Sequence, residues 1–224
     1  MHLRNVILAA FALTATVAFA QNPISADSPF QVRYAANLNI GESYINVTNT
    51  GANGAAILGP GFGAQSGNIC VNVYAFDAGE ELISCCSCLV TPDETVNLGV
   101  TRDLTVKTLT GVVPTSVTVK LLATLAGTGG SGTSCTNSAA TVQLDGEGGI
   151  VFATGLLAFG TTLHATPTAG VYATTETAFT PSTLSAGELA SISGRCASIL
   201  GNGSGFGVCN SCRAGALGGS KSGQ

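Results

Sequence analysis

Cysteines are the residues of this sequence whose type and spacing could do the most chemistry. The chain contains eight of them, at Cys70, Cys85, Cys86, Cys88, Cys135, Cys196, Cys209 and Cys212. Thiols can pair as disulfides, bind zinc as thiolates, or exchange with other disulfides. Because their number is even and the chain also carries an export signal, described below, we expect all eight to be disulfide-bonded.

The positions of the cysteines constrain the pairing without choosing it. Five lie between residues 70 and 135, and three lie between residues 196 and 212. If all eight are paired, an odd number of disulfides must join the two groups. We therefore expect at least one disulfide to tie the C-terminal tail to the preceding β region, which would give one covalently unified body.

Two C-x-x-C motifs, at 85–88 and 209–212, leave alternatives open. Four thiolates could form a tetrahedral zinc site, although the two motifs lie far apart in the sequence. A thioredoxin-like motif would need a strand-then-helix context, which neither pair shows. Haem attachment is excluded because Leu89 and Arg213 stand where a histidine is needed. In an extended segment, the adjacent Cys85 and Cys86 would point to opposite faces of a sheet.

Other candidate chemistry is weaker. A Ser-His-Asp triad would need His164 as its base, and the chain has no G-x-S-x-G motif. The acidic pairs at 80–81 and 93–94 fall at expected turns, where solvated acids are common; a glycosidase pair is the alternative. The acidic segment 145–147 lacks the ligand count of a calcium loop. We therefore predict no catalytic residue, no metal site and no cofactor, and a protein that is not an enzyme.

The N-terminal segment has the pattern of a secretory signal peptide. Arg4 precedes an uncharged, mostly apolar run over 6–19, and Ala18-Phe19-Ala20 is a small-x-small cleavage site. The run is short for a membrane span, which needs about 20 apolar residues. We expect cleavage after Ala20, with an uncleaved N-terminal anchor as the alternative. The protein would then be exported to the periplasm, the cell surface or the extracellular space.

Composition narrows the function classes further. Charged residues make up only 9% of the chain, against a usual share of about 25%. The net charge is −4, and no basic run is present, which argues against nucleic-acid binding through phosphate contacts. A weakly charged surface lowers the repulsion between copies of the chain.

Alternating apolar residues and regularly spaced turns predict an antiparallel β-sandwich, Ig-like or related. The expected strands are 30–34, 44–48, 69–76, 81–86, 95–100 and 116–123, with further extended segments at 141–144 and 149–163. The uncharged run 149–163 could be mistaken for a membrane span, but its glycines and threonines favour a buried β-hairpin. We expect no membrane span in the mature chain.

One helix is expected near the C-terminus. Ser185 and Glu188 form a capping box, and Leu184 and Leu189 are placed as a hydrophobic staple. The segment 201–203, Gly-Asn-Gly, would end the helix, and a Gly-rich tail with two cysteines follows. The domain plan is a signal peptide at 1–20, a β-sandwich region at 21–126, further strands and loops at 127–183, and the helix and disulfide-tied tail at 184–224.

Several segments resemble a family of uncharacterised exported bacterial proteins with a Ser-Cys-Cys-Ser-Cys cluster. The similar segments are 68–77, the cluster at 84–88, 160–164 and 202–209. The resemblance implies a secreted, β-rich protein and supplies no catalytic residue.

Two functional hypotheses follow from these observations. The first is a non-catalytic structural protein of the cell surface or extracellular space that assembles with itself as a homo-oligomer or filament; a leader at 21–38 could add a strand to a neighbour's sheet. The second is a monomeric binding module for a surface glycan or protein, with the Gly-rich loops 51–67 and 127–134 as contacts. An enzyme is a distant third.

Overall fold

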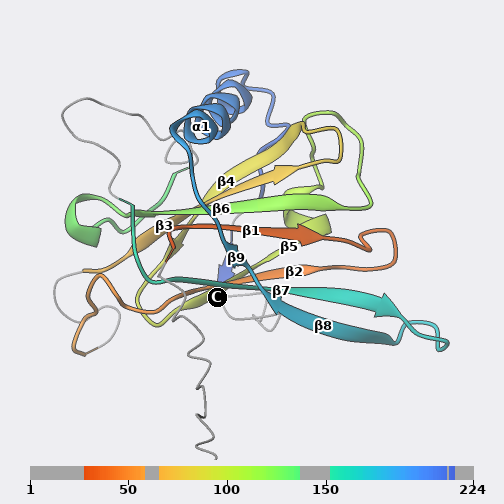
Figure 1. Ribbon diagram of the computed structural model, residues 1–224, viewed down its shortest axis with the longest axis horizontal. Helices are drawn as coiled ribbons and strands as arrows, with labels where there is room; N and C mark the ends of the chain where they lie inside the picture. Colours follow the sequence, from red (N-terminus) through yellow and green to blue (C-terminus); the bar gives the residue numbers. More distant parts are fainter. Residues whose placement is uncertain (1–27, 59–65, 137–151, 211, 215–224) are drawn as a thin grey trace, which may run out of the picture.

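A computed structural model of the protein describes residues 28–58, 66–136, 152–210 and 212–214. The fold is mainly β: two antiparallel sheets face each other, and one helix lies on the outer face of one sheet (Figure 1). The predicted β-sandwich with one C-terminal helix is therefore confirmed. The expected signal peptide and the extended segment 141–144 lie outside the described residues.

Each sheet has five strands. Sheet A has the order β4-β3-β6-β1-β9, made of β4 (Leu82–Val90), β3 (Ile69–Phe76), β6 (Val117–Leu125), β1 (Phe30–Ala35) and β9 (Thr180–Pro181). Sheet B has the order β10-β5-β2-β7-β8, made of β10 (Arg213–Ala214), β5 (Thr95–Gly99), β2 (Tyr44–Asn49), β7 (Leu156–Ala165) and β8 (Tyr172–Ala178). All pairings between these strands are antiparallel.

The main core lies between the two sheets. Alternate residues of each strand face inward, so Ile45 and Val47 of β2 share one buried cluster with Val71 and Val73 of β3. Burial of each such side chain stabilises the fold by about 1.5–3 kcal/mol before entropy is counted. This alternation is the physical reason why the strand pattern could be recognised in the sequence.

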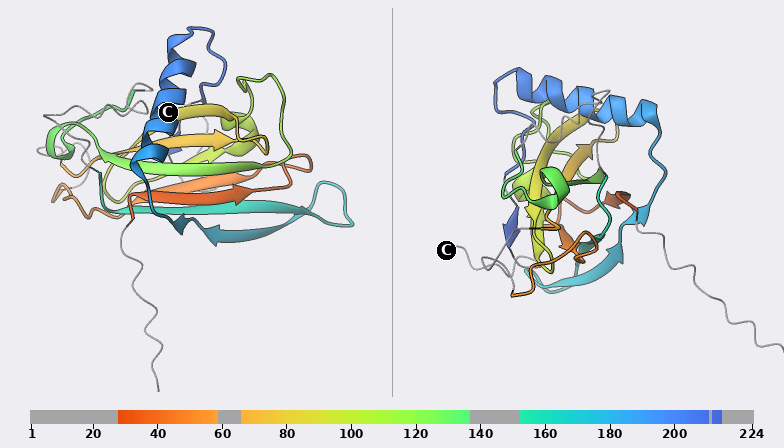
Figure 2. Two further views of the ribbon diagram at one scale, coloured as in Figure 1. Left: turned by 45° about the horizontal axis from the view of Figure 1, so that its top comes forward. Right: turned by 90° about the vertical axis from the view of Figure 1, so that its left-hand side faces the viewer.

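A second core lies on the outer face of sheet A. Every residue of β3 is buried, because helix α1 (Ala186–Gly201) covers the face that the main core does not (Figure 2). Tyr74 of β3 packs there with Ile192 and Ile199 of the helix. The helix begins as predicted: the Ser185 hydroxyl accepts a hydrogen bond of 3.1 Å from the Glu188 N–H.

Three elements differ from the expected ones. The strand expected over 81–86 continues to Val90 as β4. The strand expected over 95–100 ends at Gly99, and a single π-helical turn follows over Val100–Leu104. The segment 149–163 contributes β7, which pairs with β8 in a hairpin that projects beyond the other strands (Figures 1 and 2). In the part of the chain that the structure describes, no helix combines the length and the apolar character that a membrane span requires.

Candidate functional site

All eight cysteines are paired, in four disulfides. The pairs are Cys70–Cys135, Cys85–Cys196, Cys86–Cys209 and Cys88–Cys212. Three of them join β4 to helix α1 or to the segment after it. The predicted covalent link between the C-terminal region and the β region is confirmed, and four disulfides indicate an oxidising environment.

Neither C-x-x-C motif forms a site of its own. Cys85 and Cys88 pair with partners that lie 111 and 124 residues further along the chain. A sulfur in a disulfide is no thiolate, so it neither binds zinc nor attacks another disulfide. The two alternatives that the motifs left open therefore lose the chemical group on which they depended.

The adjacent Cys85 and Cys86 point to opposite faces of β4, as predicted. Cys85 belongs to the cluster beneath helix α1, and its disulfide partner Cys196 comes from that helix. Cys86 belongs to the cluster between the sheets. One short strand thus anchors the C-terminal region on both faces of sheet A.

A short segment after the helix, residues 207–210, lies along the free edge of β4; we call it the strap. The Cys85 N–H donates to the Gly207 carbonyl at 2.9 Å, and the Cys209 N–H donates to the Cys85 carbonyl at 3.4 Å. Nearby, the Leu109 N–H donates to the Ile83 carbonyl at 3.0 Å. The strap and residue 109 therefore satisfy backbone groups that an edge strand would otherwise expose.

Two of the other residues considered for catalysis, His164 and Glu94, have local structural partners. The Nε2 atom of His164 lies 2.7 Å from the Thr175 hydroxyl, its neighbour on β8. The Glu94 carboxylate accepts from the N–H and the hydroxyl of Thr91, at 2.9 and 3.0 Å, and closes a turn. The acidic segment 145–147 lies outside the described residues. Both contacts lie within a single hairpin or turn, His164 with Thr175 in the β7–β8 hairpin and Glu94 with Thr91 in the turn before β5, so a structural role accounts for each.

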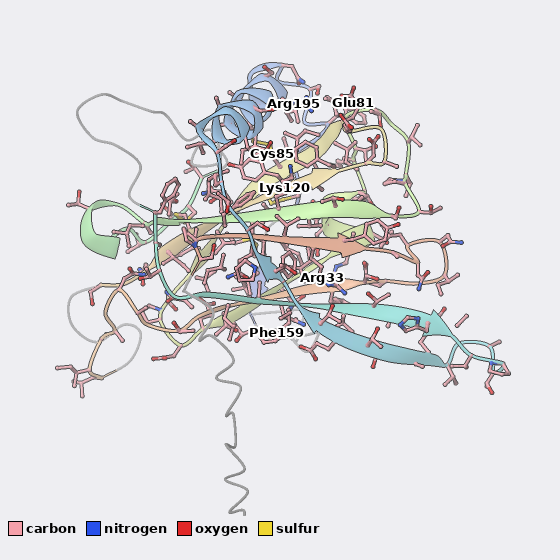
Figure 3. The ribbon with its side chains drawn as sticks, in the orientation of Figure 1. Arg33, Glu81, Cys85, Lys120, Phe159 and Arg195 are labelled. Atoms are coloured by element: carbon pink, nitrogen blue, oxygen red, sulfur yellow. A yellow bond between two sulfur atoms is a disulfide. The ribbon has the colours of Figure 1, made fainter. Side chains whose placement is uncertain are left out.

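A charged groove runs between helix α1 and the β3–β4 hairpin (Figure 3). Lys120 Nζ lies 2.6 Å from Glu188 Oε1 and 4.6 Å from the centroid of the Phe76 ring. The Arg195 guanidinium donates to the Glu80 carbonyl at 2.7 Å and lies 6.0 Å from the same ring. These contacts fasten the helix to the sheet.

The groove has two hollows, of about 410 and 270 Å³, on either side of Arg195. Leu82, Leu109 and Ile199 give the larger hollow an apolar lining. Both cations of the groove already contact a protein oxygen or carboxylate. The groove could accept a small or peptide-like ligand, although its two cations already have partners within the protein.

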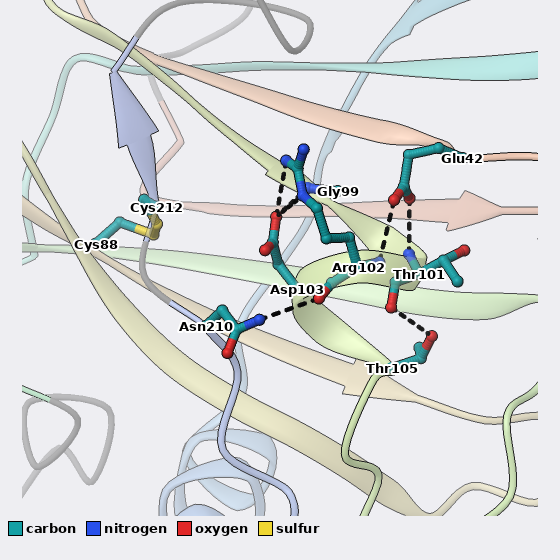
Figure 4. Close-up of polar contacts among 9 residues, drawn as sticks. All are labelled: Glu42, Cys88, Gly99, Thr101, Arg102, Asp103, Thr105, Asn210 and Cys212. Atoms are coloured by element: carbon teal, nitrogen blue, oxygen red, sulfur yellow. Dashed lines mark hydrogen bonds and ion pairs between the residues drawn. A yellow bond between two sulfur atoms is a disulfide. The ribbon is translucent and has the colours of Figure 1, made fainter. Parts of the chain in front are cut away.

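A second polar cluster surrounds the π-helical turn (Figure 4). The Glu42 carboxylate accepts from the N–H groups of Thr101 and Arg102, at 2.8 and 3.1 Å. The buried Asp103 carboxylate accepts from the Gly99 N–H at 2.7 Å and pairs with Arg102 at 3.0 Å. The hydrogen bond with Asp103 raises the pKa of Arg102. The two acids thus satisfy backbone donors at a turn, which is a structural role.

One buried cation, Arg33 of β1, points between the sheets (Figure 3). It is 9% exposed and donates to the hydroxyls of Thr177 and Thr162, at 3.1 and 2.8 Å. Its guanidinium lies against Gly160, where an added Cβ would overlap it. Burial lowers the pKa of Arg33. The side chain bridges β1 to the β7–β8 hairpin and leaves no space for a ligand beside Gly160.

Three of the four sheet edges are short or covered. β9 has two residues, and its Pro181 has no N–H to offer. β10 also has two residues, and β4 is covered in part by the strap. These are the usual ways in which proteins block edge-to-edge pairing.

The remaining edge, β8, has none of these protections. Its seven residues, Tyr-Ala-Thr-Thr-Glu-Thr-Ala, are all exposed, and the strand is the last of sheet B. It contains no proline, no lysine and no register shift. Threonine and tyrosine favour strands. In the described chain, β8 is therefore the long open edge at which another strand could pair.

Sequence reasoning missed β8 and Arg33 as functional candidates. The tyrosine and three threonines over 172–178 favour a strand and could have identified β8. Arg33 carries no such signal, because its partners lie more than a hundred residues away.

Comparisons with known proteins supply no relative: no protein-family model, no curated protein and no solved structure matches this chain.

Proposed function

We propose that this protein is an exported, non-catalytic structural protein that assembles by strand addition at the open edge of β8. The observation that carries the proposal is the contrast between β8 and the other three edges. A seven-residue strand with no proline, no lysine and no covering segment presents backbone N–H and C=O groups to a partner strand. Strand addition needs no catalytic group, in keeping with the structural roles of the polar clusters.

The covalent framework supports an extracellular setting for this role. Four disulfides persist in oxidising compartments, and they resist unfolding where no chaperone or energy source is present. The N-terminal pattern of a signal peptide agrees with export. A low charge, with a net value of −4, leaves little repulsion to oppose assembly.

A lysine pair on β8 tests the proposal. Thr174 and Thr175 are exposed neighbours on opposite faces of the strand, so Thr174→Lys/Thr175→Lys places a charge on each face of the edge, which opposes any added strand. We expect the wild-type protein to associate as its concentration rises, and the variant to stay monomeric, in multi-angle light scattering of the oxidised protein.

The matched control is Thr115→Lys/Thr183→Lys, which adds the same charge at two exposed positions outside β8. Its assembly should equal that of the wild type. If the wild type is monomeric at every concentration, or if both variants assemble as it does, the β8 edge is not an assembly interface.

A monomeric binding module is the second candidate, and two observations favour it. One is the groove beside helix α1. The other is that the described parts of the two Gly-rich loops meet at one end of the sandwich: the Asn68 N–H and side-chain amide donate to the carbonyls of Gly130 and Gly132, at 3.1 and 2.9 Å. A protein that stays monomeric but is retained on a glycan or peptide surface, with Arg195→Ala reducing retention, would support this function instead.

A further inference from the structure

We infer that the strand added at the β8 edge is β8 of a second copy of this chain, in an antiparallel pair centred on Thr175. This inference rests on the proposed function and names its partner. The pair would join sheet B of two molecules into one continuous sheet. It would also be isologous, because each molecule offers the same strand to the other.

The register follows from the length of the strand and from its one charge. Thr175 is the middle residue of β8 (Tyr172–Ala178), so an antiparallel pair centred there uses all seven residues of both copies. Glu176 then faces Thr174 of the other copy. A pair centred on Glu176 would instead set two carboxylates opposite each other, which destabilises a sheet.

The side chains on the two faces are complementary in this register. Tyr172 and Ala178 lie on the same face as Phe159, as their pairing with β7 shows. In the pair, the Tyr172 ring of one copy faces the small Ala178 of the other, so it can extend over Ala178 toward Phe159. On the opposite face the two Thr175 side chains meet, and pairs of threonines across strands are favourable.

The shape of the molecule leaves room for this partner. The β7–β8 hairpin projects beyond the ends of the other strands (Figures 1 and 2). Both faces of β8 are exposed, so a second sandwich can approach the edge without meeting the body of the first. An extended peptide from another protein could also pair there, but it would give no two-fold relation between copies.

Cysteine cross-linking tests the register. In an antiparallel pair, facing Cα atoms lie about 4.5–5.5 Å apart, within the range of about 4.4–6.8 Å that a disulfide needs. In Thr175→Cys, the new thiols of two copies would face each other. In Thr177→Cys they would be separated by four residues of strand, roughly 13 Å, and could not bond.

The experiment compares the two variants after mild oxidation, on non-reducing gels, with peptide mapping to check that the four native disulfides are intact. Thr177→Cys carries the same risk of mispairing and is the control for position; because it also removes a hydroxyl that accepts from Arg33, circular dichroism checks that the variant stays folded. We expect most of the Thr175→Cys protein in a covalent dimer through residue 175, and little of Thr177→Cys.

The outcomes separate this inference from the proposed function. If light scattering shows assembly that the lysine pair on β8 abolishes, yet Thr175→Cys gives no more covalent dimer than Thr177→Cys, then β8 is the working edge and the self-pairing is overturned. If the wild type never assembles, the proposed function fails, and the inference fails with it.

Discussion

At the scale of single residues, Arg33 fits closely against Gly160 between the two sheets. The guanidinium occupies the space that a side chain at position 160 would fill. Two threonine hydroxyls hold it there. A buried cation held by neutral hydroxyls costs desolvation energy, which the hydrogen bonds offset only in part. Its contribution is to set the spacing between β1 and the β7–β8 hairpin.

This fit predicts strong coupling between the two positions. Gly160→Ala should lower the free energy of unfolding by about 1–3 kcal/mol, because the new methyl overlaps the guanidinium. In an Arg33→Ala background the same change should cost less than about 0.5 kcal/mol, since the overlap is gone. Urea unfolding of the four proteins with disulfides intact measures both values. Equal costs in the two backgrounds would contradict the contact.

The burial of Tyr74 predicts how the free energy of unfolding changes at alkaline pH. Burial beneath helix α1 raises the pKa of its phenol. The neutral phenol is favoured in the folded state, so the unfolded state loses its proton first as the pH rises past the ordinary value of about 10. Below that pH the group has no effect. Above it, the free energy of unfolding should fall by about 1.4 kcal/mol per pH unit.

Urea unfolding between about pH 9 and pH 11.5 measures that slope on either side of the ordinary phenol pKa. Tyr74→Phe, which has no phenol to ionise, should flatten it. A slope of equal size in the variant would show that other groups cause the alkaline loss of stability.

At the scale of elements, the sequence predicted best what depends on local pattern. Ser185 and Glu188 located the helix start, and alternation located β1, β2, β3 and β6 to within one or two residues. The strand β5 was predicted one residue too long, because the turn after it is stabilised by Glu42, which is distant in sequence. β8 was not separated from its surroundings, because none of its residues is buried to produce an apolar alternation.

For the disulfides too, local pattern predicted one part and tertiary contacts determined the rest. Counting cysteines predicted a covalent link to the C-terminal region, and the adjacency of Cys85 and Cys86 predicted that the two would point to opposite faces of the sheet. The individual partners depend on where helix α1 lies over sheet A. That placement is a tertiary contact, and no spacing in the sequence encodes it.

The strap gives a prediction at this scale. Cys86→Ala/Cys209→Ala removes the disulfide within the strap and leaves Cys88–Cys212, just beyond it, in place. The hydrogen bond from the Cys85 N–H to Gly207 should then open more often. We expect amide hydrogen exchange at Cys85 to accelerate and the protein to lose about 2–5 kcal/mol of stability.

The matched control is Cys70→Ala/Cys135→Ala, which also removes one disulfide but leaves the strap attached. It should lose stability while the Cys85 amide stays protected against local opening. Equal protection of Cys85 in both variants would mean that the strap does not depend on the Cys86–Cys209 bond.

At the scale of the whole molecule, the number of open edges limits the size of an assembly. With β8 as the one long open edge in the described chain, an isologous pair uses the edge of both copies and closes. We therefore expect light scattering of the oxidised protein to level off at twice the monomer mass as concentration rises. Growth beyond that mass would require a second contact and would favour a filament over a dimer.

Releasing the strap should change that limit. In Cys86→Ala/Cys209→Ala the strap keeps its link through Cys88–Cys212 but can open locally, which exposes the edge of β4 around Cys85 as a second pairing site. A molecule with two open edges can form open-ended chains. We expect this variant to exceed the dimer mass in light scattering, while Cys70→Ala/Cys135→Ala does not. A variant that stops at the dimer would show that β4 stays covered without the bond.

The disulfide pattern also sets the order in which the bonds can form during synthesis. During synthesis Cys85, Cys86 and Cys88 precede their partners by 111, 123 and 124 residues, whereas Cys70 precedes Cys135 by 65. A growing chain can thus close Cys70–Cys135 first, but it carries three neighbouring thiols until residues 196–212 have been made. Free thiols at these three positions therefore identify a molecule that has not finished folding. Their loss shows that the helix and the strap have packed against β4.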